Sequence, residues 1–209
     1  MATFLPTSEF TQLASEEQIA KTMQALEAHG MRAVVFETGE EARAHVLDLI
    51  PAGAEVYNSP SRTLELIGLA EDIEHPTRFQ SVRVRLNSLD RVTQRQEMRR
   101  LGASPDVLVG SVHAITEQGE VLIASAVGSQ LGPAASGAGA VIWVVGTQKL
   151  VRTLEDGFRR IREYSFPLES ERTQQVYGQA SAINKILIVN GEAYPGRITI
   201  VLVKQQLGF

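Results

Sequence analysis

The sequence predicts an α/β fold with a mostly parallel sheet and helices on both faces. Apolar runs rich in Val and Ile, typical of buried strands, alternate with segments whose apolar residues recur at helical spacing. Capping patterns mark several helix starts, as in Ser15 with Gln18 and Thr38 with Glu41. This alternation of strand and helix is typical of a parallel sheet.

The first half of the chain supplies most of the predicted alternation. Val82, Val84 and Leu86 alternate with arginines, which predicts a half-exposed or edge strand. The elements expected here are an irregular arm over 1–14, a helix from Ser15 to a cap at Gly30, a strand over 33–36, a helix from Thr38 to Pro51, a strand over 55–58, a helix begun by Ser59 and Pro60, the 82–86 strand and a basic helix over 89–101.

Apolar strands dominate the centre of the chain, from residue 104 to residue 151. The segment between the last two predicted strands is too short for a crossover helix, so an antiparallel hairpin is expected at the C-terminal end. The elements expected are strands over 106–109, 121–123 and 140–145, a helix from Thr153 that Pro167 interrupts, a second helix over 168–183, and hairpin strands over 185–189 and 198–203.

Composition narrows the class of protein. The 209 residues, with 44% hydrophobic and 21% charged content, predict a single globular domain over 1–209. The net charge of −4 argues against a dedicated nucleic-acid binder. The absence of cysteine excludes disulfides and thiolate metal sites. Neither a signal peptide nor a membrane-length apolar run is evident, so we expect a soluble cytoplasmic protein that makes no membrane contact.

Two segments are candidates for anion binding. Ser59 and Ser61 follow a strand and offer hydroxyls and N–H groups at a helix start, although capping alone is the alternative. The Gly128–Gly139 loop has neither the Walker spacing nor the dinucleotide spacing of glycines. Its N–H groups can still form an anion nest, and the alternative is a tight structural turn.

Two further candidates follow predicted strands. Thr147 and Lys149 come after the strongest strand, where open α/β sheets bind ligands if that strand is parallel. Lys149 would act as an anion partner, and a surface lysine near a helix start is the alternative. Glu117, beside a glycine turn, is a candidate nucleophile or general base, and an exposed turn glutamate is the alternative. The four histidines, including His113, show no metal spacing, and no Ser-His-Asp signature or nucleophile elbow is present.

Several of these stretches together resemble the LUD-domain family, which is named for lactate utilisation. The resemblance covers roughly residues 15–190. It is carried by NSPSRTLELIG (58–68), DVLVGSVHAITEQG (106–119), SQLGP (129–133) and VIWVVGTQKLV (141–151).

The resemblance implies a Rossmann-like fold shared with ribose-phosphate isomerase, glucosamine-phosphate deaminase and CoA-transferases. It implies a small anionic metabolite as ligand, such as an organic acid, acyl-CoA or phosphate, in organic-acid utilisation. By analogy with the Glu-Asn-Gly setting of CoA-transferases, Glu117-Gln118-Gly119 suggests an acyl- or CoA-transferase as an alternative. A non-catalytic assembly subunit with redox protein partners is the third hypothesis.

We therefore take Glu117 as the candidate catalytic residue, and we expect no metal and no bound cofactor. A homodimer is also expected, because unpaired apolar edges invite contact with a second subunit. The candidate ligand-binding residues are Ser59, Ser61, Gly110, Ser111, Gly128, Ser129, Gln130, Gly132, Gly146, Thr147 and Lys149.

Overall fold

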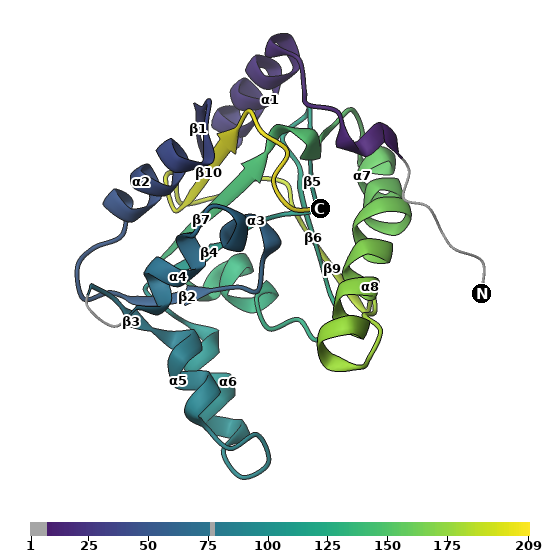
Figure 1. Ribbon diagram of the computed structural model, residues 1–209. Helices are drawn as coiled ribbons and strands as arrows, with labels where there is room; N and C mark the ends of the chain where they lie inside the picture. The colour runs from purple at the N-terminus through teal and green to yellow at the C-terminus, as the bar shows by residue number, and fades with distance from the viewer. Residues whose placement is uncertain (1–7, 76–77) are drawn as a thin grey trace.

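The computed structural model describes residues 8–75 and 78–209, and it has the expected α/β architecture (Figure 1). A large sheet of six parallel strands forms the centre, in the order β1-β10-β7-β4-β2-β3. Its strands are β1 (Arg32–Phe36), β2 (Glu55–Asn58), β3 (Gln80–Ser81), β4 (Val107–Gly110), β7 (Ala140–Gly146) and β10 (Ile198–Val203).

A second sheet of four strands, in the order β8-β5-β6-β9, was not predicted. It is mixed, because β5 pairs antiparallel with β6 and parallel with β8, while β9 pairs antiparallel with β6. Its strands are β5 (Ala114–Thr116), β6 (Val121–Ser125), β8 (Leu150–Val151) and β9 (Lys185–Val189).

Helices cover both faces of the large sheet, as expected. Apolar side chains of α2 (Gly39–Leu49), α3 (Arg62–Leu66) and α4 (Leu69–Glu74) pack on one face. The other face packs against α1 (Glu16–Ala28), α5 (Val82–Ser88) and the inner face of the small sheet, with Trp143 buried in this layer. Together these contacts place the main core between the two sheets.

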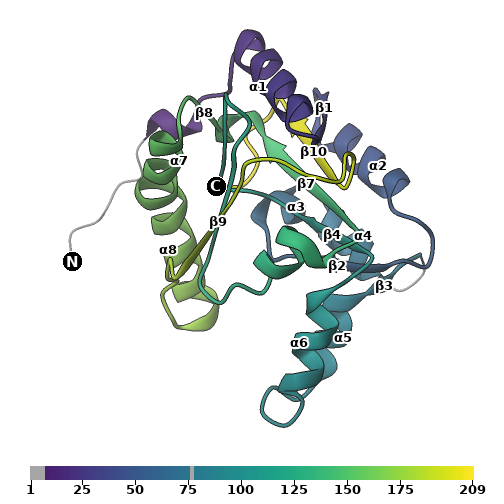
Figure 2. The ribbon, with the colours of Figure 1, turned by 180° about the vertical axis from the view of Figure 1, so that it is seen from behind.

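The outer face of the small sheet is covered by one nearly continuous helical rod, seen in Figure 2. The rod consists of α7 (Leu154–Arg160), the π-helical segment η4 (Ile161–Ser165) and α8 (Phe166–Tyr177). Pro167 was predicted to interrupt the helix, and this prediction was wrong. The proline lies in the first turn of α8, where a missing N–H is tolerated, and the π-helical turn before it joins the two α-helices.

The remaining elements are short or project from the body. Helices α5 and α6 (Arg95–Ala103) extend away from the sheets (Figure 1), and α6 buries none of its residues. The other short segments are η1 (Ser8–Thr11), η2 (Pro133–Gly137) and η3 (Thr147–Lys149). The predicted irregular arm over 1–14 thus contains η1, and its residues 1–7 lie outside the described residues. Among the helices described, none is long and apolar enough to cross a membrane.

The predicted C-terminal hairpin does not form. β9 lies in the small sheet beside β6, whereas β10 lies in the large sheet between β1 and β7. The segment between them docks on the end of α1, where Glu192 N–H donates to His29 O at 2.8 Å. The connection therefore crosses from one sheet to the other, where β10 is fully buried between two strands and β9 forms a half-buried edge.

Two local predictions around the serines were also wrong. Residues 82–86 form helix α5, because Ser81 caps its N-terminus by accepting from Val84 N–H at 3.3 Å. Helix α3 is capped by Ser61, whose hydroxyl accepts from Leu64 N–H, and Ser59 lies two residues before this cap. Ser59 instead donates its N–H to Val109 O at 2.9 Å, which prolongs the pairing of β2 with β4.

Candidate functional site

The carboxyl ends of β2, β4 and β7 meet at one edge of the large sheet. Ser59 follows β2, Ser111 follows β4, and η3 with Lys149 follows β7. From β2 the chain continues to β3 on one side, whereas from β4 it continues to β7 and β10 on the other. Such a reversal of strand order opens a crevice between neighbouring strand ends, the usual ligand site of open α/β sheets.

A cavity of about 240 Å³ lies at this edge. Residues from both sheets, from η4 and α8, and from the C-terminal segment line it, including Ser111, His113, Lys149, Ser165 and Phe209. Two of its arginines are already paired with carboxylates, Arg62 with Glu65 and Arg172 with Glu169. The polar character of the wall therefore comes mainly from hydroxyl groups and Lys149.

Lys149 is buried at the cavity wall, with 2% of its surface exposed. Its Nζ lies 3.1 Å from Thr63 Oγ1, 3.0 Å from Ser111 Oγ and 3.2 Å from Val112 O. In the part of the chain that the structure describes, it has no carboxylate partner within 4.0 Å. Burial lowers the pKa of Lys149 well below its ordinary value, and the positive charge of Arg160 lowers that pKa further.

Arg160 is the second buried cation and lies behind the cavity wall. Its guanidinium donates to His113 O, to Ser165 Oγ at 3.0 Å and to Gln148 O at 3.4 Å. The Nη2 atom is buried without a hydrogen-bond partner. Burial lowers the pKa of Arg160 to about 10, so the side chain stays charged at neutral pH.

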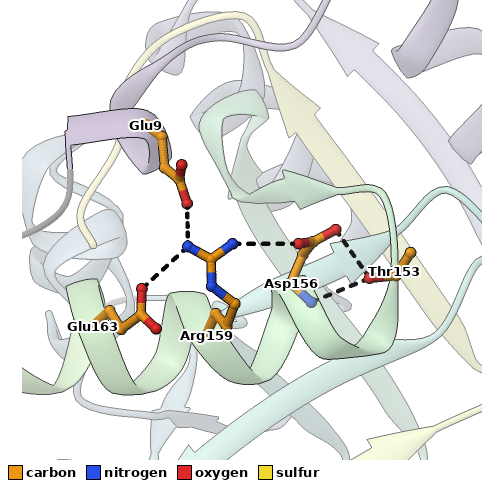
Figure 3. A network of polar contacts seen from close by, with 5 residues as sticks. All are labelled: Glu9, Thr153, Asp156, Arg159 and Glu163. Carbon is orange, nitrogen blue, oxygen red and sulfur yellow. Dashed lines mark hydrogen bonds and ion pairs between the residues drawn. The ribbon is translucent and has the colours of Figure 1, made fainter.

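The neighbouring Arg159 shows the usual arrangement for comparison. It lies on the outer face of α7 and pairs with Glu9 at 2.7 Å, Glu163 at 3.3 Å and Asp156 at 3.7 Å (Figure 3). Arg160 has no such partner among residues 8–75 and 78–209. Two adjacent arginines thus differ in that only the exposed one is neutralised.

The π-helical turn η4 explains how Arg160 comes to lie directly behind the cavity wall. Arg160 and Ser165 are five residues apart, which is the spacing of a π-helical turn, and their side chains are hydrogen-bonded. Ile161 and Ser165 of the same turn line the cavity. Single π-helical turns within α-helices occur frequently at functional sites.

His113 contributes a neutral ring to the wall. Its Nδ1 accepts from Ala124 N–H at 3.1 Å, so the ring proton lies on Nε2 and is available as a donor. Burial lowers the pKa of His113 to about 3, with smaller contributions from the positive charges of Lys149 and Arg160. The sequence indicated only that His113 shares no metal-binding spacing with the other histidines, and the structure places it on the cavity wall.

About half of the predicted ligand-binding residues come together at this cavity. The predicted residues on its wall are Ser59, Ser61, Ser111, Ser129, Gln130 and Lys149. Those away from the described wall are Gly110, Gly128, Gly132, Gly146 and Thr147.

Gly110 and Gly146 still shape the site from outside. A Cβ on Gly110 would lie 2.5 Å from Ser59 Oγ, so a side chain at this position would force the Ser59 hydroxyl to move. A Cβ on Gly146 would lie 2.6 Å from Gln205 O, where the C-terminal segment crosses the end of β7. Both glycines therefore permit close packing at this edge of the sheet.

Glu117 lies apart from the cavity. Its carboxylate accepts from Lys21 Nζ of α1 at 2.7 Å, and its side chain is 16% exposed. It is not among the residues that line the described cavity. Its catalytic role stays a prediction, without support from this geometry.

Sequence reasoning missed Thr63, Arg160, Ser165 and Phe209. One signal for Arg160 was available, because Gly157, Arg160, Ile161 and Tyr164 follow helical spacing and place a charge in an apolar stripe. The described residues contain no group of three or more His, Asp or Glu placed to hold a metal ion.

Comparison with known proteins agrees with this architecture. A solved structure of a DUF162 family protein from Deinococcus radiodurans matches with a TM-score of 0.52 and 12% identity, covering 92% of this chain and 99% of the other. No protein of curated function matches. The model of the LUD domain matches residues 19–208, which include both sheets and every residue of the cavity wall except Phe209. On the strength of that match, the chain belongs to the LUD domain family.

Proposed function

We propose that the protein binds a small anionic metabolite, through a carboxylate or phosphate group, in the cavity at the carboxyl ends of β2, β4 and β7. Such a ligand suits the organic-acid utilisation for which the LUD family is named. The observation that carries the proposal is the pair of buried basic side chains, Lys149 and Arg160, which have no carboxylate partner among the described residues.

An anion would complete the electrostatics of this site. Burying a charge without a counter-ion costs several kcal/mol, so buried cations are normally paired. Arg160 keeps its charge at neutral pH, and an anionic ligand would favour the protonated form of Lys149. The hydroxyls of Ser59, Ser61 and Ser129 supply hydrogen bonds around the ligand.

The size of the cavity limits the ligand. Its volume of about 240 Å³ lies below the roughly 300–1,000 Å³ of pockets for drug-sized molecules. A short organic acid fits this space as a whole. For an acyl-CoA, only the acyl end would enter, and the nucleotide part would remain outside.

Isothermal titration calorimetry tests the proposal with lactate, pyruvate, a sugar phosphate and acetyl-CoA as separate ligands. We expect measurable heat with at least one of them, and binding at least about tenfold weaker in Lys149→Met, equivalent to ~1.4 kcal/mol. Lys204→Met is the matched control, because Lys204 pairs with Glu16 and Glu37 away from the cavity. Flat heats with all four ligands would remove the support for this class of ligand.

The neighbouring arginines provide a second matched pair. Arg160→Met should weaken binding, whereas Arg159→Met should not, because Arg159 is exposed and already neutralised by Glu9 and Glu163 (Figure 3). Circular dichroism of each variant controls for loss of folding. Equal affinity in all variants would mean that the buried cations do not hold the ligand.

The other hypotheses of the sequence remain predictions. Mass spectrometry after incubation with acyl-CoA donors would detect a covalent adduct on Glu117, and pull-down would detect redox protein partners. Size-exclusion chromatography with light scattering tests the homodimer. An edge for such pairing exists at β9, which pairs with β6 on one side and has no strand on the other within the described parts of the chain.

A further inference from the structure

Ser111 and Lys149 have the geometry of a nucleophile and its base. Ser111 follows β4 directly, lines the cavity, and places its Oγ 3.0 Å from Lys149 Nζ. Activated nucleophiles lie within ~2.6–3.2 Å of their base, and the base is normally oriented by a third group. Here Thr63 Oγ1 at 3.1 Å and Val112 O at 3.2 Å hold the amine on its other sides.

The hydrogen-bond donors and acceptors around Lys149 Nζ determine how the amine can interact with Ser111. The Thr63 hydroxyl donates to Leu207 O at 3.1 Å, so it can only accept from Lys149. Val112 O is also an acceptor. A neutral amine has two N–H donors for these two acceptors, and its lone pair is then left for the proton of the Ser111 hydroxyl.

The surroundings favour the neutral amine that a base requires. Burial removes Lys149 from water, and the nearby positive charge of Arg160 opposes protonation, so its pKa is lowered. The other charged groups on the cavity wall are the ion pairs Arg62–Glu65 and Arg172–Glu169, and His113 is neutral. None of these carboxylates lies within 4.0 Å of Nζ, so none holds Lys149 as an ammonium ion.

We propose that Ser111 and Lys149 form a nucleophile–base dyad that accepts an acyl group from an ester or thioester of a small acid. The Ser111 oxygen bonds to the acyl carbon while Lys149 takes the hydroxyl proton. The bond from that carbon to the leaving oxygen or sulfur then breaks, and Lys149 returns the proton to the leaving group. Water or an acceptor alcohol or thiol, activated by the same amine, releases the acyl group and regenerates Ser111.

The inference deepens the proposed function and rests on it for the substrate class, since the cavity that Ser111 and Lys149 line has room for a short acyl group. The reactivity of Ser111 itself does not depend on the charge of a ligand. A simple structural role, in which Ser111 only helps to hold Lys149, would leave its hydroxyl no more reactive than any other serine.

A small uncharged dialkyl fluorophosphonate tests the dyad in the intact protein. Attack by Ser111 forms a P–O bond and expels fluoride, and the proton passes to Lys149. Peptide mass spectrometry should find the adduct on Ser111, and Ser111→Ala should abolish it. Ser181→Ala is the matched control, because Ser181 lines the same cavity and makes no hydrogen bond to a lysine among the described residues.

Variants of the base make the test specific. Lys149→Arg keeps a donor group but cannot act as a base at neutral pH, so labelling should slow by at least ~100-fold, the lower range for general-base catalysis. If that variant does not fold, the pH profile of the native protein decides. Labelling should rise with pH and level off well below 10.5, the ordinary pKa of lysine. No adduct on Ser111, or a rate equal to that of other serines, would overturn the proposal.

The calorimetric experiment tests anion binding and the labelling experiment tests the dyad, so either proposal can be rejected without the other. Anion binding without labelling would reject the dyad and keep the proposed function. Labelling of Ser111 without binding of any anion would keep the dyad and reject the anionic ligand.

Discussion

The half-buried imidazole of His113 should make the protein less stable in mild acid than at neutral pH. The ring accepts a hydrogen bond from Ala124 N–H and lies near two cations, so the native state resists its protonation. In the unfolded chain the same ring titrates near its ordinary pKa of 6.5, whereas in the folded protein the pKa is about 3. Between these values the unfolded state binds a proton that the native state does not.

The sign and size of the effect follow from this difference. Stability from neutral His113 is fully present above pH 6.5 and is lost as the pH falls toward 3. At pH 5 the loss relative to pH 8 amounts to about 2 kcal/mol, taking 1.36 kcal/mol per pKa unit. This is an upper value, because one side of the ring faces the cavity, where water can soften the penalty.

The assay is urea denaturation followed by circular dichroism at pH 8, 6.5 and 5. His113→Asn is the informative variant, since its Oδ1 can accept from Ala124 N–H and it has no proton to gain. Carboxylates titrate in both proteins, so the difference between the two pH profiles isolates His113. If native protein and variant lose the same free energy of unfolding between pH 8 and pH 5, the reasoning about the buried ring is refuted.

Two further predictions concern stability. Gly137→Ala should destabilise the folded protein by ~1–3 kcal/mol, because the new Cβ would lie well inside van der Waals contact of the Ala103 backbone carbonyl. Gly102→Ala, in the exposed helix α6, should instead stabilise the folded protein by ~0.5–1 kcal/mol. Similar thermal midpoints for the two variants would contradict the packing of η2 against α6. Thr38→Ala should cost ~1 kcal/mol in urea denaturation, since it removes the capping box of α2, and an unchanged midpoint would mean that the cap carries no stability.

Local patterns predicted five of the six strands of the large sheet, all but β3, because the apolar runs of the strands and the caps of the helices between them carry their own signals. The capping box at Thr38 and Glu41 forms as expected, and β2 covers the predicted residues 55–58. The parallel arrangement also follows from the alternation of strands with helices. The family match and the fold of the solved relative agree with this part of the prediction.

Tertiary pairing explains where the prediction was wrong. The alternation at Val82, Val84 and Leu86 fits a strand by period, yet only Val82 is buried there and the Ser81 cap directs the chain into α5. The hairpin was inferred from a short connection, but its two strands pair with strands of different sheets, β9 with β6 and β10 with β1 and β7. Which strands pair in which sheet depends on the tertiary structure, so the short distance along the chain did not predict the pairing of these two strands.

The functional site, like the fold, could be predicted from the sequence only in part. Lys149 could be predicted, because its position after an apolar strand places it at a sheet edge whatever the details of packing. Its most informative property, a buried amine held by Thr63, Ser111 and Val112 without a carboxylate, depends on segments 86, 38 and 37 residues away. Only the fold brings them together, so a residue chosen as an anion partner proves equally suited to act as a base. The two roles can follow one another at one atom, since the proton that Lys149 takes from Ser111 gives it the positive charge that an anionic intermediate or product requires.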